Sequence, residues 1–338
     1  MGVNIADIIE RKKSSLDRFS NKIIAVDALN TIYQFLASIR MEDGAPLRDP
    51  KGRMVSHLSG ILTRNANLIK YGIKPVYVFD GEPPELKMDV LAERKERKIK
   101  AEEDWKQALK EGDLELARTK AQQTSRITED VLESAKKLLE YLGIPVVQAP
   151  SEGEAQASFM AQRNDVWAVA SQDFDSILFG APRLVRNITV SGRRKLPRQN
   201  RYINIEPEEI ELEKVLASLD LSREQLIDIG ILIGTDFNEG IKGIGPKKAL
   251  KLVRKHKDMK NILKELAVDI DNYAPIREFF LNPPVTSDYR LEWKNADIDN
   301  VKKLLCDEHA FSEQRISKSL EKFIESNKTR SQKTLDFY

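Results

Sequence analysis

The sequence contains very little cysteine and histidine. Its 338 residues include one cysteine, Cys306, and three histidines, His57, His256 and His309. One cysteine cannot form an internal disulfide or a cysteine-rich zinc site, which favours a reducing compartment over secretion. The scattered histidines leave little choice for a three-histidine metal site or a His-centred catalytic triad. Any metal or acid–base chemistry should therefore depend on carboxylates.

Long hydrophobic runs are also missing. No apolar run approaches the roughly 18 residues that a membrane span needs, and the N-terminus has no signal-peptide core. We therefore expect a soluble, intracellular protein without a membrane partner. Separately, we expect a monomer located in the cytoplasm, or in the nucleus if the source is eukaryotic. The chain is long enough for about two domains or one large α/β unit.

An excess of charge of one sign is absent as well, since 55 Lys and Arg residues oppose 53 Asp and Glu residues. The balance hides two basic segments. Residues 176–205 contain seven basic residues and no acid, and residues 242–264 contain nine basic residues and a single acid, Asp258. Segments this basic are typical of polyanion-binding surfaces, because each neutralised phosphate releases condensed counterions. For either segment alone, a solvated helix face or loop is the alternative interpretation.

A third charged segment, residues 85–126, mixes 11 basic with 10 acidic residues. Pairs of opposite charge four positions apart, such as Glu93 and Arg97, indicate exposed helix, and Gly112 divides the segment. Few apolar positions are available for packing into a core. We therefore predict a polar helical hairpin that projects from the globular body.

The rest of the chain alternates short apolar, β-branched runs with amphipathic stretches. The pattern predicts strands at 22–26, 75–79, 144–147, 166–170 and 184–190, and helices at 28–39, 58–71, 128–142 and 225–233. This alternation predicts an α/β fold, with a mostly parallel, doubly wound sheet and helices on both faces. Ligands bind such sheets beyond the carboxyl ends of the strands.

Acidic residues follow four of these predicted strands. They are Asp27 and Asp80 after the first two strands, Glu152 and Glu154 after the third, and Asp173 and Asp175 after the fourth. Like charges this close raise one another's pKa values unless cations compensate. Oxygen ligands without nearby His or Cys select hard ions, Mg²⁺ or Mn²⁺. We interpret these carboxylates as a metal site, with Asp236 as a further candidate that the sequence alone does not place.

Each acid also has a purely structural interpretation. Asp27 fits the cap of the helix that begins at residue 28, and Asp80 fits a turn. Both glutamates fit the first turn of a helix capped by Ser151, where the helix dipole favours negative charge. Successive strands that all end in acids are harder to explain in this way than any single acid.

Residues 240–249 lie between an apolar helix and a basic helix. Two glycines permit a tight turn there, and Pro246 suits the first helical position, so that backbone N–H groups point towards an anion. The pattern resembles a helix-hairpin-helix, which binds duplex phosphates without regard to sequence. An ordinary Gly-Pro turn is the alternative. The DNA-binding residues of this motif would include Gly243, Gly245, Lys247 and Lys248.

Five blocks of sequence resemble, in order, the signature blocks of the flap endonuclease family of structure-specific nucleases. The blocks are VDALNTIYQFL, PVYVFDGEPPELK, GIPVVQAPSEGEAQA, SQDFDSILFG and IGTDFNEGIKGIGPKKA. The resemblance implies a Rossmann-like (PIN-like) nuclease core with a helical arch. It also implies hydrolysis of a phosphodiester near the junction of a 5′ flap with duplex DNA, in replication (Okazaki fragment processing) and repair, together with 5′–3′ exonuclease activity.

The resemblance assigns roles to individual residues. Its metal-binding acids fall on Asp27, Asp80, Glu152, Glu154, Asp173, Asp175 and Asp236. The first four would serve mainly one Mg²⁺ and the last three a second, and Mn²⁺ would substitute. Lys87 and Arg94 fall on arch residues that contact the scissile phosphate, and their spacing of seven places them on one helix face. Tyr33 falls on an aromatic residue that stacks on a terminal base, and a half-buried core tyrosine is the alternative.

Three details of the chain depart from the family, and one of them is an arch that contains more acid than a phosphate-binding surface would. Gly153 replaces the usual Ala between the two glutamates. The tail resembles a peptide that binds a sliding clamp of the proliferating cell nuclear antigen type, but it is one residue short before its aromatic pair. Clamp binding is therefore expected to be weakened or shifted in register, and it would use Gln332, Leu335, Phe337 and Tyr338. We expect residues 326–333 to be a disordered tether.

The same considerations predict the organisation of the chain. We expect an N-terminal nuclease region at 1–102, an arch at 84–126, an internal nuclease region at 120–262 that includes the hairpin at 225–255, a C-terminal helical region at 263–325 and a flexible tail at 326–338. The substrate would be branched DNA with a 5′ flap.

Two other functions are open at this point. A strand followed by Asp-x-Asp is also the nucleophile motif of haloacid-dehalogenase-like phosphatases, in which Asp173 would attack a phosphate. That interpretation leaves the other acids and the hairpin unexplained. A non-catalytic protein that binds branched DNA would explain the basic segments, but not so many acids in these places.

Overall fold

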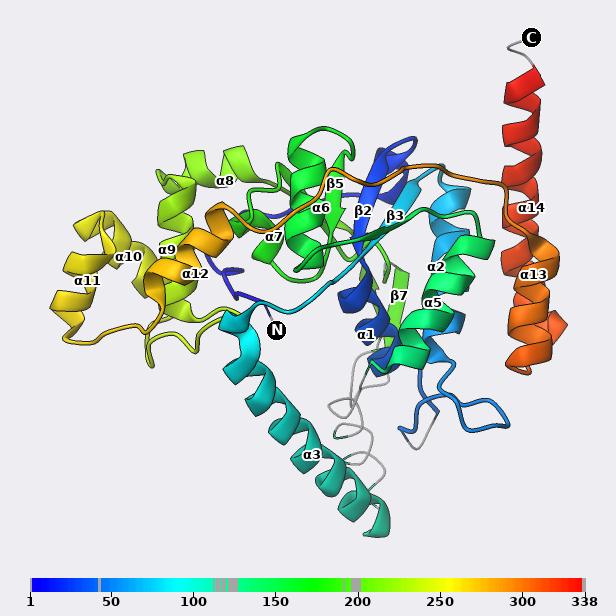
Figure 1. Ribbon diagram of the computed structural model, residues 1–338, viewed down its shortest axis with the longest axis horizontal. Coiled ribbons are helices and arrows are strands. Elements are labelled where there is room, and N and C mark those ends of the chain that lie inside the picture. Colours follow the sequence, from blue (N-terminus) through cyan, green and yellow to red (C-terminus); the bar gives the residue numbers. More distant parts are fainter. Residues whose placement is uncertain are drawn as a thin grey trace.

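The computed structural model describes the backbone of residues 2–41, 44–111, 113, 116, 120, 127–190, 192–195 and 202–335. Side chains are described for these residues except 89, 91–95, 97, 98, 109, 192–195, 202, 203 and 329–335. A seven-stranded sheet lies at the centre, and helices surround it (Figure 1). Its strands are β1 (Lys12–Lys13), β2 (Ile23–Asp27), β3 (Lys74–Phe79), β4 (Val146–Gln148), β5 (Ala168–Ala170), β6 (Arg183–Arg186) and β9 (Glu208–Glu211).

The strand order is β1-β9-β6-β5-β2-β3-β4, and the five strands from β6 to β4 are parallel. Val26 of β2 pairs with Tyr77 of β3 on one side and with Ala170 of β5 on the other. From β2 the chain first builds outward through β3 and β4, and it then continues on the opposite side with β5 and β6. The order therefore reverses between β2 and β5, and doubly wound sheets bind ligands beyond the strand ends at such a switch point. The predicted mostly parallel α/β sheet is confirmed.

The five predicted strands correspond to β2 to β6 and agree closely with them except at the end of β6, whereas β1 and β9 were not predicted. The prediction continued β6 to residue 190, but the strand ends at Arg186. Asn187 has a φ of 62°, a left-handed conformation that interrupts an extended strand. The apolar run continues past this turn, so hydrophobicity alone did not reveal it.

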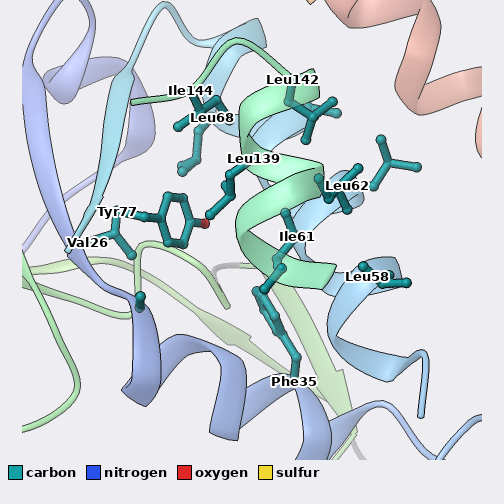
Figure 2. Close-up of a cluster of buried hydrophobic side chains, with 14 of the residues drawn as sticks. Val26, Phe35, Leu58, Ile61, Leu62, Leu68, Tyr77, Leu139, Leu142 and Ile144 are labelled. Carbon is teal, nitrogen blue, oxygen red and sulfur yellow. The ribbon is translucent and has the colours of Figure 1, made fainter. Parts of the chain in front are cut away.

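Helices cover both faces of the sheet, as expected. One face carries α1 (Ala28–Ser38), α2 (Ser56–Lys70) and α5 (Glu129–Tyr141), and the other carries α6 (Gly153–Gln162). Because side chains alternate along a strand, Val26 belongs to the first layer and Ala25 to the second. Figure 2 shows Val26 and Tyr77 pointing from the sheet towards Leu139 of α5 and Ile61 of α2.

A long helix, α3 (Met88–Lys110), projects from the body (Figure 1). It follows directly on a short 3-10 turn, η2 (Glu85–Lys87). The prediction of a polar helix in this segment is confirmed over the range of α3. Gly112, where the predicted hairpin divides, lies outside the described residues.

A second hydrophobic cluster lies beside the sheet and includes the N-terminal residues Val3, Ile5 and Ile9. Its helices are α7 (Asp175–Leu178), α8 (Leu212–Leu219), α9 (Arg223–Ile233), α10 (Pro246–His256), α11 (Met259–Leu266) and α12 (Tyr273–Leu281). The predicted hairpin is formed by α9 and α10. A separate two-stranded sheet consists of β7 (Gly192–Lys195) and β8 (Tyr202–Ile205).

The C-terminal region crosses the molecule and then forms a helical unit beside α2 and α5 (Figure 1). Residues 282–297 have no regular structure and lie along the α6 layer, where Trp293 Nε1 donates to the Pro75 carbonyl at 2.8 Å. The unit comprises α13 (Ile298–Lys302), a π-helical turn, η3 (Lys303–Glu308), and α14 (Glu313–Leu335). None of the described helices combines the length and the apolar character that crossing a membrane needs.

The prediction of a disordered tether at 326–333 is wrong for the backbone. These residues continue α14, which is anchored nearer its start by the buried side chains of Ile316, Leu320 and Phe323. Once this packing has nucleated the helix, each further residue adds a hydrogen bond at little cost. The polar composition of the segment therefore did not prevent helix formation.

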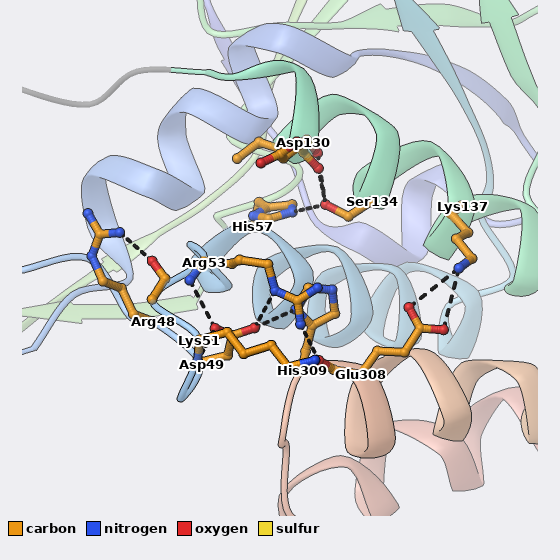
Figure 3. Close-up of polar contacts among 12 residues, drawn as sticks. Arg48, Asp49, Lys51, Arg53, His57, Asp130, Ser134, Lys137, Glu308 and His309 are labelled. Atoms are coloured by element: carbon orange, nitrogen blue, oxygen red, sulfur yellow. Dashed lines mark hydrogen bonds and ion pairs between the residues drawn. The ribbon is translucent and has the colours of Figure 1, made fainter.

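Polar contacts hold the 44–55 loop against this C-terminal unit (Figure 3). Asp49 accepts hydrogen bonds from Arg53 Nε at 2.7 Å and from His309 Nδ1 at 3.1 Å, and Arg53 also donates to the carbonyl of Glu308. Although burial opposes the shift, these hydrogen bonds lower the pKa of Asp49 to about 2. The loop and the C-terminal unit are thus joined by a charged contact that persists into acid.

His57 provides a test of this region's response to pH. The side chain is fully buried in α2, and Nε2 lies 2.8 Å from Ser134 Oγ of α5 (Figure 3). Burial lowers the pKa of His57 to about 3. In the unfolded chain the His57 imidazole binds a proton near pH 6.5, whereas in the folded protein it stays neutral until the pH is near 3. The free energy of unfolding should therefore fall as pH decreases from about 6.5 towards 3. Urea denaturation across this range should show a shallower decline for His57→Gln, and parallel profiles would contradict a neutral buried His57.

Candidate functional site

The switch point of the sheet carries two of the predicted acids. Asp27 ends β2, and its Oδ1 accepts a hydrogen bond from the backbone N–H of Asn30 at 3.0 Å. Asp173 follows β5, and its Oδ2 accepts from the Asn30 side chain at 2.8 Å. Ser171 donates to Asp27 at 3.4 Å and accepts from the Asp173 N–H at 3.2 Å. Asp27 therefore caps α1, as the structural interpretation predicted. It also forms an acid pair with Asp173 across the crevice.

Glu154 and Asp175 extend this pair from the first turns of α6 and α7. Asp175 is only 5% exposed, and Glu154 is partly buried, with its Oε1 atom shielded from solvent. The backbone N–H of Val3 donates to Asp175 Oδ1 at 2.7 Å. A Cβ atom on Gly2 would lie 2.8 Å from both carboxylate oxygens of Asp175, so the beginning of the chain packs directly against the site.

Asp80 and Glu152 form the other half of the cluster. Asp80 follows β3, and its Oδ1 accepts from the N–H of Gly153 at 2.8 Å. A Cβ atom on Gly153 would lie 2.6 Å from this oxygen, so the glycine that departs from the family pattern permits the close approach. Ser151 is not the helix cap: Glu152 occupies the N-cap position, and Ser151 Oγ has no hydrogen-bond partner in the described part of the chain.

Lys87 connects Glu152 with Asp236, the candidate that the sequence did not place. Its ammonium group lies 2.7 and 2.9 Å from the two oxygens of Glu152 and 3.5 Å from Asp236 Oδ2. All three side chains are largely shielded from solvent, with 11% of Lys87, 14% of Glu152 and 15% of Asp236 exposed. The structure thus brings Asp236 to the cluster. It also places Lys87 in η2, before α3 begins, rather than on the helix face that the spacing to Arg94 predicted.

Burial, together with repulsion between the acids, raises the pKa values of several carboxyl groups in the cluster. Burial raises the pKa of Asp27 and that of Glu154 well above the ordinary range, and the neighbouring charges of Asp80 and Asp175, respectively, add to the rise. Burial and the charge of Glu152 raise the pKa of Asp80 to about 6. Burial and the charge of Asp236 raise the pKa of Asp175 to about 7. The cluster therefore needs positive charge to be fully ionised at neutral pH.

Lys87 supplies part of this charge. Burial alone would lower the pKa of Lys87, but Glu152 and Asp236 reverse the shift and raise it. One ammonium group cannot neutralise seven carboxylates. Further cations at this edge would relieve the remaining repulsion.

The donor set fits a hard divalent cation. Every candidate ligand is a carboxylate oxygen, and Glu154 Oε1 is buried with no hydrogen-bond partner among the described residues. Among those residues, no three Asp, Glu, His or Cys side chains are gathered tightly enough to hold an ion as they lie.

The predicted hairpin has the geometry of a phosphate-binding turn. Gly243 has a φ of 82°, which favours glycine, and Gly245 is the N-cap of α10 with Pro246 at the first helical position. No atom lies within 4 Å of where a Cβ on either glycine would project, so the turn is open to a ligand. Ile244 between them is buried and anchors the turn in the hydrophobic cluster. Lys247 and Lys248 are exposed in the first turn of α10.

The structure describes only some of the remaining residues that were predicted to contact DNA or a clamp. Tyr33 is 36% exposed on α1, an exposure that fits both the stacking role and the half-buried alternative. The side chains of Arg94, Gln332 and Leu335, and the whole of Phe337 and Tyr338, lie outside the described residues. Of the basic residues at 176–205, the structure describes the side chains of Arg183 and Arg186 alone.

Sequence reasoning missed several residues that position the acids. Asn30 and Ser171 hold the carboxylates at the switch point, and the backbone of Gly2 and Val3 closes the site. Ser171 stands two residues before Asp173, a spacing at which a hydroxyl often accepts from the backbone and which offered a signal. The N-terminal contact had no signal, because it depends on a main-chain N–H and not on a residue type.

Comparison with known protein families agrees with this site. A model of the XPG N-terminal domain matches residues 1–101, and a model of the XPG I-region matches residues 143–236. The first range contains Asp27, Asp80 and Lys87, and the second contains the other acids of the cluster. The fold and the site thus define a nuclease of the XPG class.

Relatives that match nearly the whole chain identify the family within this class of nucleases. Flap endonuclease 1 of Pyrococcus furiosus is 56% identical over 99% of this chain and 98% of the relative, and that of Archaeoglobus fulgidus is 54% identical over 95% and 96%. The solved flap endonuclease-1 from Methanococcus jannaschii is 42% identical, with a TM-score of 0.77 over 97% of this chain and 100% of that chain. The chain belongs to the flap endonuclease family, whose members are structure-specific nucleases for 5′ flaps. The phosphatase and the non-catalytic alternatives are therefore set aside.

Proposed function

We propose that this chain cleaves DNA at the junction between a 5′ single-stranded flap and the duplex, using two divalent ions held by the acid cluster. The observation that carries the proposal is the convergence of buried and partly buried carboxylates at the switch point, with Lys87 among them. Asp27, Asp80, Glu152 and Glu154 would serve mainly one ion, and Asp173, Asp175 and Asp236 the other. Mg²⁺ is the proposed ion, and Mn²⁺ would substitute.

When bound, two such ions activate a water molecule and stabilise the leaving oxygen. The protein's own residues prepare the place for this chemistry. Asn30, Ser171 and the Val3 N–H orient the carboxylates, and burial excludes competing water. Lys87 stands at the edge of the cluster, where its ammonium group can exchange a carboxylate for a substrate phosphate. No protein nucleophile is needed.

The DNA would contact three further elements. The hairpin would hold duplex phosphates, Tyr33 would stack on a base near the junction, and α3 with Arg94 would lie beside the flap. This arrangement accounts for structure-specific recognition, because duplex and single strand would be held by different parts of the protein.

The hairpin contribution can be measured from the salt dependence of binding. We expect Lys247→Ala/Lys248→Ala to weaken duplex binding and to reduce the slope of log affinity against log salt by about 1 to 2, since each lost phosphate contact removes about one released counterion. Lys318→Ala is the matched control, because it removes an exposed charge on α14. An unchanged slope in the hairpin double variant would exclude this surface from DNA binding.

The proposed reaction is tested by sizing the products of a 5′-labelled flap substrate over time. Cleavage at the junction should require Mg²⁺, resume with Mn²⁺ and stop with a chelator. Products released one nucleotide at a time from a recessed 5′ end would report the proposed exonuclease activity. Cleavage that continues in the chelator would overturn the metal assignment.

We also propose a monomer in the cytoplasm that acts in replication and repair, with a sliding clamp as its partner. Clamp contact would use Gln332 and Leu335 at the end of α14, together with Phe337 and Tyr338, which follow in the sequence. The helix supports this proposal because its last turns extend away from the body (Figure 1). Titration of labelled clamp with the chain and with Phe337→Ala would test it, and equal affinities would exclude the aromatic pair.

A further inference from the structure

The basic segment at 176–205 contains two arginines on β6 that have opposite surroundings. Arg183 begins the strand, and its guanidinium carbon lies 5.3 Å from the centre of the Trp167 ring, at the amino end of the parallel strands. Arg186 ends the strand, at the edge that carries the acid cluster. The segment was interpreted as a polyanion-binding surface, but Arg186 is directed into the protein.

Arg186 makes three contacts, and two of them are to the turn that follows β5. Its Nε donates to the carbonyl of Gln172 at 3.0 Å, and its guanidinium carbon lies 4.4 Å from the centre of the buried Phe174 ring. Its Nη1 donates to Glu208 Oε2 at 3.1 Å, which fixes the direction of the guanidinium plane from β9. One planar group thus holds the backbone and a side chain of the same turn.

The two contacts lie on either side of Asp173 in the sequence. Gln172 precedes Asp173, while Phe174 separates Asp173 from Asp175. Asn30 and Val3 hold the carboxylates of these acids, whereas Arg186 holds the main-chain carbonyl just before Asp173 and the Phe174 ring between the two acids. Burial lowers the pKa of Arg186, but the charges of Glu208 and Asp173 oppose this shift, which is consistent with a charged group beside the turn.

We propose that Arg186 is a positioning residue that fixes the 172–175 turn and thereby sets the affinity of one metal position, the one assigned to Asp173, Asp175 and Asp236. The inference rests on the proposed function, because it takes these acids as ligands. Metal affinity depends on how well the ligands are held before the ion arrives, and removing an outer contact of a ligand commonly weakens binding by about 10- to 100-fold.

The test measures Mn²⁺ binding directly, by electron paramagnetic resonance of the full chain without DNA. Arg186→Met keeps an unbranched apolar stem and removes the guanidinium, and it should raise the Mn²⁺ dissociation constant by about 10- to 100-fold. Arg183→Met is the matched control on the same strand, and its dissociation constant should stay within about twofold of the wild type. Arg186→Lys keeps the charge without the planar fork and should restore only part of the affinity.

Two further variants and a measurement of flap affinity distinguish the positioning role of Arg186 from a direct contact with DNA. Phe174→Leu and Glu208→Gln each remove one partner of Arg186 and should shift Mn²⁺ affinity in the same direction by a smaller factor, so they decide the matter if Arg186→Met fails to fold. Affinity for a labelled 5′ flap in the presence of a chelator should be the same in Arg186→Met and wild type. A loss of flap affinity as large as the loss of Mn²⁺ affinity would overturn the proposal in favour of a DNA contact.

Asp173→Asn separates this inference from the proposed function. If Asp173→Asn leaves Mn²⁺ binding unchanged, the ligand assignment itself is wrong. If Asp173→Asn weakens Mn²⁺ binding and Arg186→Met does not, the ligand assignment stands and the positioning role of Arg186 is refuted.

Discussion

Asp175→Asn is expected to abolish cleavage of a 5′ flap while the protein still folds and still binds the flap. The substitution keeps the shape of the side chain, and its amide oxygen can still accept the hydrogen bond that Val3 N–H donates at 2.7 Å. It removes one negative charge from a group that is 5% exposed and surrounded by other acids. In single-turnover conditions we expect the cleavage rate to fall by at least about 10²- to 10³-fold, the loss seen when one electrostatic contact to a transition state is removed.

The folded state should not suffer from this change. Asparagine is neutral, so it relieves the repulsion from Asp236 and Asp173 that contributes to the raised pKa of Asp175. Thermal unfolding without metal should therefore show equal or greater stability, and flap affinity in a chelator should equal that of the wild type. Asp165→Asn, a change of the same type at a partly exposed site after α6, should leave cleavage intact. Full Mg²⁺-dependent cleavage by Asp175→Asn would remove the acid cluster from the mechanism.

The sequence predicted the acids because they share one simple geometric property. Parallel strands all point the same way, so residues that end them meet at one edge whatever the details of packing. Asp27, Asp80 and Asp173 could be grouped on that basis without any coordinates. The prediction also tolerated small errors in the strand bounds, since each acid follows the end of its strand.

Other parts of the site depend on contacts that no local pattern encodes. Lys87 was expected on the projecting helix facing a phosphate, but its four-carbon stem allows it to reach back to Glu152 and Asp236. Asp236 follows a helix rather than a strand of the sheet, and Arg186 reaches the 172–175 turn across the sheet. The polar tail likewise became helix because buried residues far upstream support it. These features are set by tertiary structure, where one side chain meets a segment that is distant in sequence.

Lys87→Met should produce two separate defects, and metal should correct only one of them. Without metal, the substitution leaves Glu152 and Asp236 without the ammonium group that lies 2.7 and 3.5 Å from them. Removing one partner of such a shielded pair typically costs about 3–5 kcal/mol of unfolding free energy. Because a divalent ion replaces the missing charge, saturating Mg²⁺ should restore most of that stability. Lys22→Met, which removes an ammonium group beside Trp167, should show neither effect.

The second defect concerns the rate of cleavage and distinguishes two roles for Lys87. If the side chain only neutralised carboxylates in the metal-free protein, saturating Mg²⁺ would return single-turnover cleavage to the wild-type rate. If the ammonium group moves to the scissile phosphate once ions occupy the acids, cleavage should remain about 10²- to 10³-fold slower at saturating Mg²⁺, while flap affinity changes much less. We expect the second result, because two added cations would repel a third charge from among the carboxylates, and a phosphate at this edge would be its nearest anion. Recovery of the full rate in Mg²⁺, or an equal loss of affinity and rate, would exclude that movement.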